Sequence, residues 1–136
     1  MMAGAMSNET FISTAMVEVD ARSDFWREAT RPVFDTSPLS PDSKEPLEGT
    51  ISSRPLGSMI IGSTSFNSQR YIRDHRTIVH SGLDYYLIQV FTSGKMNGDF
   101  NGLGVHADVG DICFLDLAKA FKSEAAAGSC NLPARS

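Results

Sequence analysis

The spacing of apolar positions predicts one short helix in the first third of the chain. Four apolar residues recur at helical spacing and form one side of this helix: Phe25, Trp26, Ala29 and Val33. The Ser23 hydroxyl is expected to cap the first turn, where the negative charge of Asp24 is also favourable. Pro32 disfavours helical geometry in the residue before it, so the helix is expected to end near Arg31.

After the helix, a loop is followed by patterns typical of strands. Residues 35–49 carry three prolines together with Ser, Asp and Lys, which is typical of a loop. Five later segments have alternating or continuous apolar patterns and are predicted strands: 50–54, 58–66, 71–80, 85–92 and 112–117. Four turns are predicted beside them: Ser93-Gly94, Asn97-Gly98, Asn101-Gly102 and Val109-Gly110-Asp111. Short, closely spaced strands with one early helix predict a mainly β barrel or sandwich.

The two ends of the chain have weaker patterns. Residues 1–20 are predicted to form a flexible N-terminal arm with one short strand near its end. Residues 124–129 are rich in alanine, and no closing strand is predicted after them. Residues 130–136 show no periodicity, so we expect an unrelated or disordered tail.

Composition and charge narrow the class of protein. The 136 residues suffice for one domain with a hydrophobic core. A net charge of −4 and a pI near 5.2 argue against a broad electrostatic contact with nucleic acid or anionic lipid. No apolar run approaches the roughly 20 residues of a membrane helix, no signal-peptide pattern is visible, and two cysteines are too few for a disulfide scaffold. We expect a soluble, cytoplasmic protein that does not bind membranes.

Six segments together resemble one family of regulators. In chain order they are 24–29 (DFWREA), 54–57 (RPLG), 69–73 (QRYIR), 84–90 (DYYLIQV), 93–94 (SG) and 110–116 (GDICFLD). Their combination and order resemble the N-terminal, cupin-like ligand-binding domain of AraC/XylS-type transcriptional regulators. The resemblance implies a mainly β, cupin-like (jelly-roll type) barrel preceded by one short amphipathic helix. It also implies a small-molecule effector as the partner of the domain, with a homodimer as an open alternative.

The chain departs from this family pattern in two ways. Regulators of this kind carry a C-terminal region with two helix-turn-helix units, and no such helices are predicted here. The later strands and the dimerisation helices of the sensory domain are also missing from the pattern. We therefore expect a fragment with an incomplete barrel: a partial AraC-type ligand-binding domain at residues 21–129 that does not bind DNA directly.

The histidines do not have the spacing of a metal site. Cupin metal sites combine a His-x-His pair with a Glu and a further His on a later strand. His75 and His80 are five apart, which on the predicted strand 71–80 places them on opposite faces. His106 follows much later without a suitably spaced Glu. We predict no metal site, and the histidines are interpreted as surface or loop residues.

Other candidate chemistry also has simpler structural interpretations. Asp108 and Asp111 flank a turn in which Asp bonds its own backbone, and Asp116 is expected to cap a bend. Cys113 lies in an apolar strand and is expected to be buried, whereas Cys130 is expected to be exposed and free. The glycines lack a phosphate-binding pattern. Arg70, Arg73 and Arg76 do not share one strand face, which favours a solvated strand over a nucleic-acid surface.

A pocket inside the barrel is the remaining candidate site. One face of the central strand carries Tyr85, Leu87, Gln89 and Phe91, and the other carries Tyr86, Ile88, Val90 and Thr92. The sequence does not decide which face points inward, so no ligand-binding, catalytic or cofactor residue is assigned. Either set suits an apolar or aromatic effector, and both suit core packing equally well.

These observations predict the effector-sensing domain of an AraC-type regulator without its DNA-binding region, and not an enzyme. The alternative is a free-standing small cupin that binds or isomerises a small metabolite. A third possibility is a non-functional remnant whose open strand edges would make the isolated chain poorly soluble.

Overall fold

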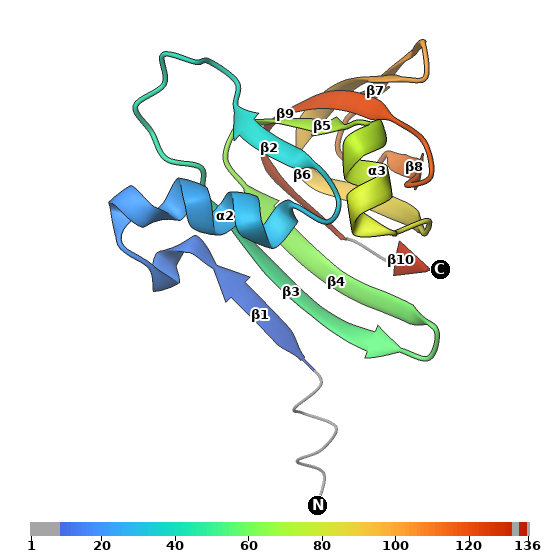
Figure 1. The fold of residues 1–136 in the computed structure, drawn as a ribbon, viewed down its shortest axis with the longest axis horizontal. Coiled ribbons are helices and arrows are strands. Elements are labelled where there is room, and N and C mark those ends of the chain that lie inside the picture. Colours follow the sequence, from blue (N-terminus) through green and yellow to red (C-terminus); the bar gives the residue numbers. More distant parts are fainter. Residues whose placement is uncertain (1–8, 132–133, 136) are drawn as a thin grey trace, which may run out of the picture.

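The structure is a computed structural model that describes residues 9–131 and 134–135. Its strands form one ten-stranded antiparallel sheet that curves into a barrel (Figure 1). The strands are β1 (Thr10–Ser13), β2 (Asp35–Pro38), β3 (Gly49–Leu56), β4 (Met59–Phe66), β5 (Gln69–Arg73), β6 (Tyr86–Phe100), β7 (Leu103–Ala107), β8 (Ile112–Asp116), β9 (Phe121–Asn131) and β10 (Ala134–Arg135). The helices are α2 (Arg22–Thr30) and α3 (His75–Ser81), with short 3-10 turns η1 (Thr14–Met16) and η2 (Val19–Ala21).

Two long strands organise the barrel. β6 and β9 pair antiparallel from the Val90–Asn131 pair to the Phe100–Phe121 pair, with register irregularities between Phe91 and Lys95. The other edge of β9 pairs with β5 through residues 121–125 and with β4 through residues 128–131. β9 therefore joins the β1-β3-β4 part of the sheet to the β5-β2 part. Helix α2 crosses between β2 and the β1–β3 pair (Figure 1).

The predicted helix is confirmed, but its cap is not. α2 ends at Thr30 with Arg31 as its C-cap, as the position of Pro32 predicts. Its N-cap is Ala21, which makes no side-chain cap bond. The Ser23 hydroxyl instead accepts a hydrogen bond from the Leu47 backbone N–H at 3.0 Å. The hydroxyl thus ties the helix to the loop before β3 instead of satisfying a donor of its own first turn.

The predicted strand over residues 71–80 is wrong in its second half. β5 ends at Arg73, and His75–Ser81 forms α3. The Asp74 carboxylate caps this helix by accepting from the Thr77 N–H at 2.9 Å, and Gly82 ends it with φ 63°. These two capping residues outweigh the strand propensity of the β-branched residues between them.

The predicted turns have mixed outcomes. Ser93-Gly94 and Asn97-Gly98 are not turns, because β6 runs through both to Phe100. The positive φ of Gly94, 76°, lies within the irregular part of the β6–β9 pairing, where a bulge needs such a residue. Asn101-Gly102 forms the predicted β6–β7 hairpin with φ values of 58° and 87°, as a type I′ turn requires. Gly110, with φ 90°, lies in the predicted turn before β8.

The ends of the chain differ from the predicted arm and tail. Thr10–Ser13 forms β1 and pairs with β3, and Thr14 is buried. Residues 1–8 lie outside the described residues. The sequence predicts no closing strand after residues 124–129, but β9 spans Phe121–Asn131, and Ala134–Arg135 pairs with β4 and β6. Residues 132, 133 and 136 also lie outside the described part. The predicted loop 35–49 begins with a short strand, β2.

Candidate functional site: an apolar cavity in the barrel

The barrel encloses a cavity of about 130 Å³. Helix α2 forms one wall with Trp26, Ala29 and Thr30, and the curved sheet forms the others. Seven aromatic side chains line the cavity: Trp26, Phe34, Phe66, Tyr71, Phe91, Phe100 and Phe121. The strands contribute alternate residues and the helix contributes residues three or four apart, so no single motif forms the cavity.

The structure settles which face of the central strand points inward. Leu87, Gln89 and Phe91 line the cavity, and Leu87 and Phe91 are buried. Tyr86 on the opposite face is 47% exposed. Tyr85, just before β6, packs against the cluster around Leu87 and is not part of the cavity wall.

The aromatic rings of the wall contact one another in a chain. The ring centroids of Phe34 and Tyr71 are 4.6 Å apart, and Phe66 meets Tyr71 edge-on at 6.3 Å. Phe121 contacts both Phe34 at 6.0 Å and Phe100 at 5.2 Å. Tilted and edge-to-face pairs at these separations are favourable, so each ring is held by its neighbours.

A buried glutamine fixes two of these rings. The side-chain oxygen of Gln69 accepts hydrogen bonds from the Trp26 indole N–H at 3.0 Å and from the Tyr71 hydroxyl at 2.8 Å. Its amide nitrogen donates to the Glu48 carbonyl at 2.8 Å and to the Asn67 side chain at 2.9 Å. Gln69 is fully buried. The network therefore holds Trp26 and Tyr71 in place from behind the cavity wall.

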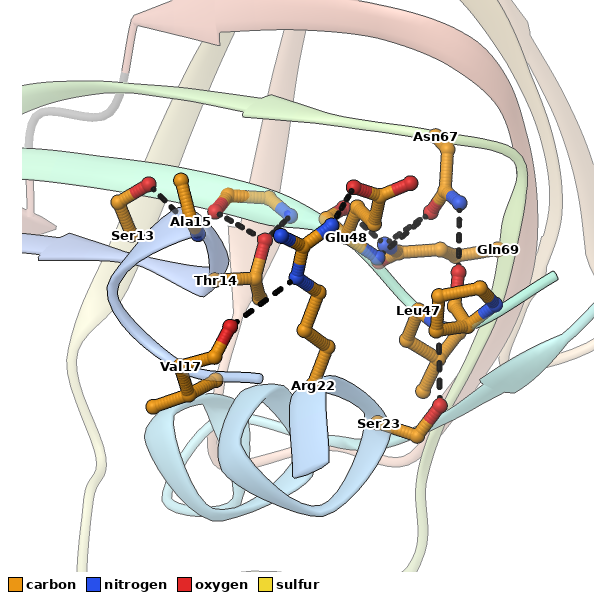
Figure 2. Close-up of polar contacts among 12 residues, drawn as sticks. Ser13, Thr14, Ala15, Val17, Arg22, Ser23, Leu47, Glu48, Asn67 and Gln69 are labelled. Carbon is orange, nitrogen blue, oxygen red and sulfur yellow. Dashed lines mark hydrogen bonds and ion pairs between the residues drawn. The ribbon is translucent and has the colours of Figure 1, made fainter. Parts of the chain in front are cut away.

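The beginning of α2 is tied to the start of β3 (Figure 2). The Arg22 guanidinium lies 3.0 Å from the Glu48 carboxylate and donates to the Val17 carbonyl at 3.3 Å. The Thr14 hydroxyl accepts from the Gly49 N–H at 3.1 Å and donates to the Gly49 carbonyl at 3.3 Å. The Trp26 indole lies so close over Gly49 that no β-carbon fits there. Gly49 is therefore required for α2 to sit against the sheet.

The two threonine hydroxyls of the cavity wall are already hydrogen-bonded to protein. The Thr30 hydroxyl bonds the Trp26 carbonyl at 2.9 Å and the Thr36 hydroxyl at 2.8 Å. The Thr64 hydroxyl donates to the Thr50 carbonyl at 2.7 Å. Within the described residues, no buried side-chain nitrogen or oxygen lacks a hydrogen-bond partner.

The sequence predicts that Arg73 lies on a solvated strand. This prediction is wrong, because Arg73 is fully buried. Its guanidinium donates five hydrogen bonds, to the carbonyls of Leu117 (2.8 Å), Pro32 (2.9 Å), Val33 (2.7 Å) and Leu83 (3.0 Å) and to the Ser81 hydroxyl (3.2 Å). Burial lowers the pKa of Arg73 from its ordinary value. By contrast, Arg70 pairs with Glu124 at 2.9 Å on the surface. Arg73 joins the segment after α2 to the end of α3 and to the loop before β9.

The three histidines lie outside the cavity wall, at exposed positions as predicted. His75 and His80 are on α3, not on a strand as expected. His106, on β7, has ring nitrogens 2.6 Å from the Asn97 side-chain oxygen and 2.9 Å from the Asp108 carboxylate. In the described part of the chain, no three His, Cys, Asp or Glu side chains are grouped as metal ligands would be.

Asp111, Asp116 and Cys113 have the predicted structural roles, whereas the Asp108 carboxylate contacts His106 and not its own backbone. The Asp111 carboxylate accepts from the Asp108 N–H at 2.7 Å, and Asp116 accepts from the Ala118 N–H at 3.0 Å. Cys113 is buried, and burial, with a smaller contribution from the Asp111 charge, raises the pKa of its thiol. The side chain of Cys130 lies outside the described residues.

Two further features lie on the surface of the protein. A depression of about 740 Å³ opens between the end of α2 and α3, and its lining mixes the cations Arg31 and Arg76 with the anions Asp35 and Asp74. Because both signs of charge are present, the lining favours neither an anionic nor a cationic ligand. On the outside of the barrel, Tyr86 and Phe114 contact each other with ring centroids 5.2 Å apart, and both are exposed together with Ile112.

The topology and enclosed cavity define a mainly β, cupin-like fold. The chain matches the crystal structure of the AraC-like transcriptional activator CuxR with a TM-score of 0.85 and 17% identity, over 93% of this chain and 46% of that one. A protein of unknown function from Rhizobium leguminosarum bv. viciae 3841 matches with a TM-score of 0.50 and 14% identity, over 64% of this chain and 79% of that one. The predicted resemblance to the cupin-like domain of AraC-type regulators is confirmed at the level of the fold.

Sequence comparison adds one curated relative. It is described as an uncharacterized protein in the nit 5′ region of Bacillus sp. (strain OxB-1) and is 33% identical over 90 residues. The match covers 64% of this chain and 34% of the relative. The chain thus spans about a third of this relative and about half of the AraC-like activator. No protein-family model matches the sequence. None of the described helices is both long and apolar enough to cross a membrane.

Proposed function

We propose that the chain is the effector-sensing module of an AraC-type transcriptional regulator and binds a small molecule inside the barrel. The observation that carries this proposal is the apolar cavity with α2 as one wall. The fold shared with an AraC-like activator over 93% of the chain supports it. Enclosed, mainly apolar cavities lined by aromatic side chains are the usual form of small-molecule sites.

Sensing requires that the ligand prefers one of two conformations of the protein. Trp26, Ala29 and Thr30 of α2 face the cavity. A ligand in the cavity therefore contacts both the sheet and a helix that is a separate element from the sheet. The proposed response is a shift in the position of α2 relative to the sheet. This chain supplies the sensing step only. It does not catalyse a reaction, and with a net charge of −4 it does not bind operator DNA by itself.

Thermal unfolding with a panel of small neutral and charged metabolites tests the ligand-binding part. A ligand present at 100 times its Kd stabilises the folded state by about 2.7 kcal/mol, which corresponds to a rise in Tm of roughly 10 °C for a domain of this size. A gel shift with the same sample is expected to show no specific DNA binding. Turnover of any panel compound would instead favour the alternative of a free-standing cupin that isomerises a metabolite.

A chimeric regulator tests the sensing part. The matching half of the AraC-like activator is replaced by this chain, and a reporter gene is placed under its promoter. We expect reporter output to change with the compound that raises the Tm of the isolated chain. Reporter output that is insensitive to a compound shown to bind the chain would contradict the sensing role.

A weak homodimer is the partner that the outer barrel face suggests. Tyr86, Ile112 and Phe114 are 47%, 69% and 60% exposed and lie on the paired strands β6 and β8. Since an aromatic side chain buries about 150–250 Å², packing this face against a second copy would bury several hundred Å², as in weak, transient interfaces. Sedimentation at rising concentration should show a dimer that Phe114→Ser removes. A monomer at all concentrations would refute this pairing.

A further inference from the structure

We propose that the cavity accepts an uncharged molecule built on a single six-membered ring and rejects charged or two-ring molecules. This inference rests on the proposed function of the cavity as the ligand site. It follows from the size of the cavity, the absence of charge in its described wall and the character of its lining.

Size sets the upper limit. An engineered cavity of about 150 Å³ lined by apolar side chains binds benzene. The cavity of this chain, at about 130 Å³, is of similar size and therefore fits one ring but not two. A fused second ring would have to displace wall residues such as Tyr71 and Trp26, which the bonds to Gln69 hold in place.

Charge sets the second limit. None of the described residues that line the cavity is Asp, Glu, Lys, Arg or His. Arg73, the one buried cation among the described residues, directs its five hydrogen bonds to backbone carbonyls and the Ser81 hydroxyl and is not part of the wall. A ligand carboxylate or ammonium group would be desolvated with no opposite charge to pair with, which is strongly unfavourable.

The lining favours a ring over an aliphatic chain. Aromatic rings surround the cavity on several sides, and the Met96 side chain completes the wall between Phe91 and Phe100 on β6. Ring–ring and sulfur–ring contacts each contribute binding free energy beyond the burial of apolar surface that any apolar ligand would gain. The hydroxyls of Thr30 and Thr64 are already bonded to protein, so neither of these two groups requires a polar ligand.

Trp26 provides an internal reporter for the test. It is the single tryptophan of the chain, and its buried indole lines the cavity. The full chain is titrated with benzyl alcohol and with benzoate while indole fluorescence is recorded. A naphthalene-ring alcohol is tested by saturation-transfer NMR, because its own absorption obscures the indole. We expect a saturable response to benzyl alcohol and binding of benzoate and of the two-ring alcohol that is at least about 100-fold weaker.

A cavity-filling variant tests the location. Ala29 faces the cavity from α2, and Ala29→Leu places an isobutyl group there while keeping a strong helix former. The matched control is Ala118→Leu, the same change at an exposed turn position. Binding of benzyl alcohol is expected to be lost in Ala29→Leu and retained in Ala118→Leu. Should Ala29→Leu fail to fold, NMR contacts between ligand ring protons and the Trp26 and Phe91 side chains locate the ligand in the unchanged chain.

The outcomes separate the two proposals. The proposed ligand class is overturned if benzoate or the two-ring alcohol binds as tightly as benzyl alcohol. If Ala29→Leu also abolishes that binding, the cavity remains the sensing site. Binding that survives Ala29→Leu without contacts to Trp26 overturns the location. If no compound of any class binds the folded chain, the proposed function fails together with this inference.

Discussion

Replacing Arg73 is the most direct test of how this fold is held together. The change Arg73→Met removes the guanidinium and keeps a side chain of comparable length. Four backbone carbonyls and the Ser81 hydroxyl then lose their donor. If Arg73 contributed mainly through packing of its aliphatic stem, Met would be tolerated.

Two opposing terms decide the magnitude. Hydrogen bonds to a charged group contribute about 1.5–3 kcal/mol each, so a simple sum over five bonds would rival the whole stability of a domain, about 5–15 kcal/mol. Burying the charge opposes this sum, and the same burial lowers the pKa of Arg73. Each buried acceptor left without its donor costs about 1–3 kcal/mol, and removing the buried charge offsets several kcal/mol of this loss, which leaves a net cost of roughly 3–5 kcal/mol. We expect Arg73→Met to lower the free energy of unfolding by that amount, and Arg73→Lys by less, because Lys keeps the charge but has only three donors.

Urea unfolding followed by circular dichroism measures the effect. With a urea m-value of about 2 kcal/mol/M, the expected loss lowers the midpoint by roughly 1.5–2.5 M. Arg70→Met is the matched control, because Arg70 lies on the same strand and its exposed ion pair with Glu124 is worth at most about 1 kcal/mol. An Arg73→Met midpoint no lower than that of Arg70→Met would refute the reasoning.

Three further predictions concern single positions. Gly49→Ala forces a methyl group into the indole above it and is expected to cost about 1–3 kcal/mol, whereas Gly104→Ala, with no atom within 4 Å of the new methyl, should change urea stability little. The hydrogen bond from the Thr77 N–H lowers the pKa of Asp74 in the folded protein. The Asp74 carboxylate therefore contributes to the free energy of unfolding above its unfolded pKa near 3.8, and this contribution is lost as pH falls through the lower folded pKa. Asp74→Ala should therefore be less stable than the unchanged chain at neutral pH, and the difference should vanish in acid melts. Burial, with a smaller contribution from the nearby Asp111 charge, raises the pKa of the Cys113 thiol. In a variant that lacks the other cysteine, a thiol reagent should therefore react with Cys113 far more slowly in buffer than in urea. Equal rates in the two solvents would contradict this prediction.

Local patterns predict the elements whose signals are local. The helix around Trp26, the strands at residues 50–54 and 58–66 and the Asn101-Gly102 hairpin follow from spacing and turn chemistry within a few residues. The strand β8 is confirmed for the same reason. Each of these elements has the periodicity of its own backbone, so neighbours in space are not needed to identify it.

The elements that local patterns do not predict depend on partners far along the chain. In β9, Phe121, Ser123 and Ala125 alternate inward, but two of the three are small, so the apolar alternation is faint. Pairing with both β5 and β6 makes this segment a strand. The length of β6 has the same origin, since turn-like glycine pairs become strand residues when β7 and β9 pair along them.

The cavity could be predicted only as a general consequence of a barrel. Both faces of residues 85–92 are apolar, so the pattern of the strand does not decide which face turns inward. The exposed Tyr86 and Phe114 show that the outer face is apolar as well. The burial of Arg73 is hidden from local patterns for a related reason, because it depends on carbonyls from segments some 40 residues away in the sequence.

The cavity and the Arg73 network meet in the segment that follows α2. Val33 and Phe34 present their side chains to the cavity, and the carbonyls of Pro32 and Val33 bind the Arg73 guanidinium. The other end of α2 is fixed through Arg22 and Glu48. A molecule in the cavity therefore contacts a helix held at both ends, and whatever moves the segment after α2 also strains the bonds of Arg73 to α3. For this reason, we expect ligand binding in the cavity to change the structure of the outer surface first between α2 and α3.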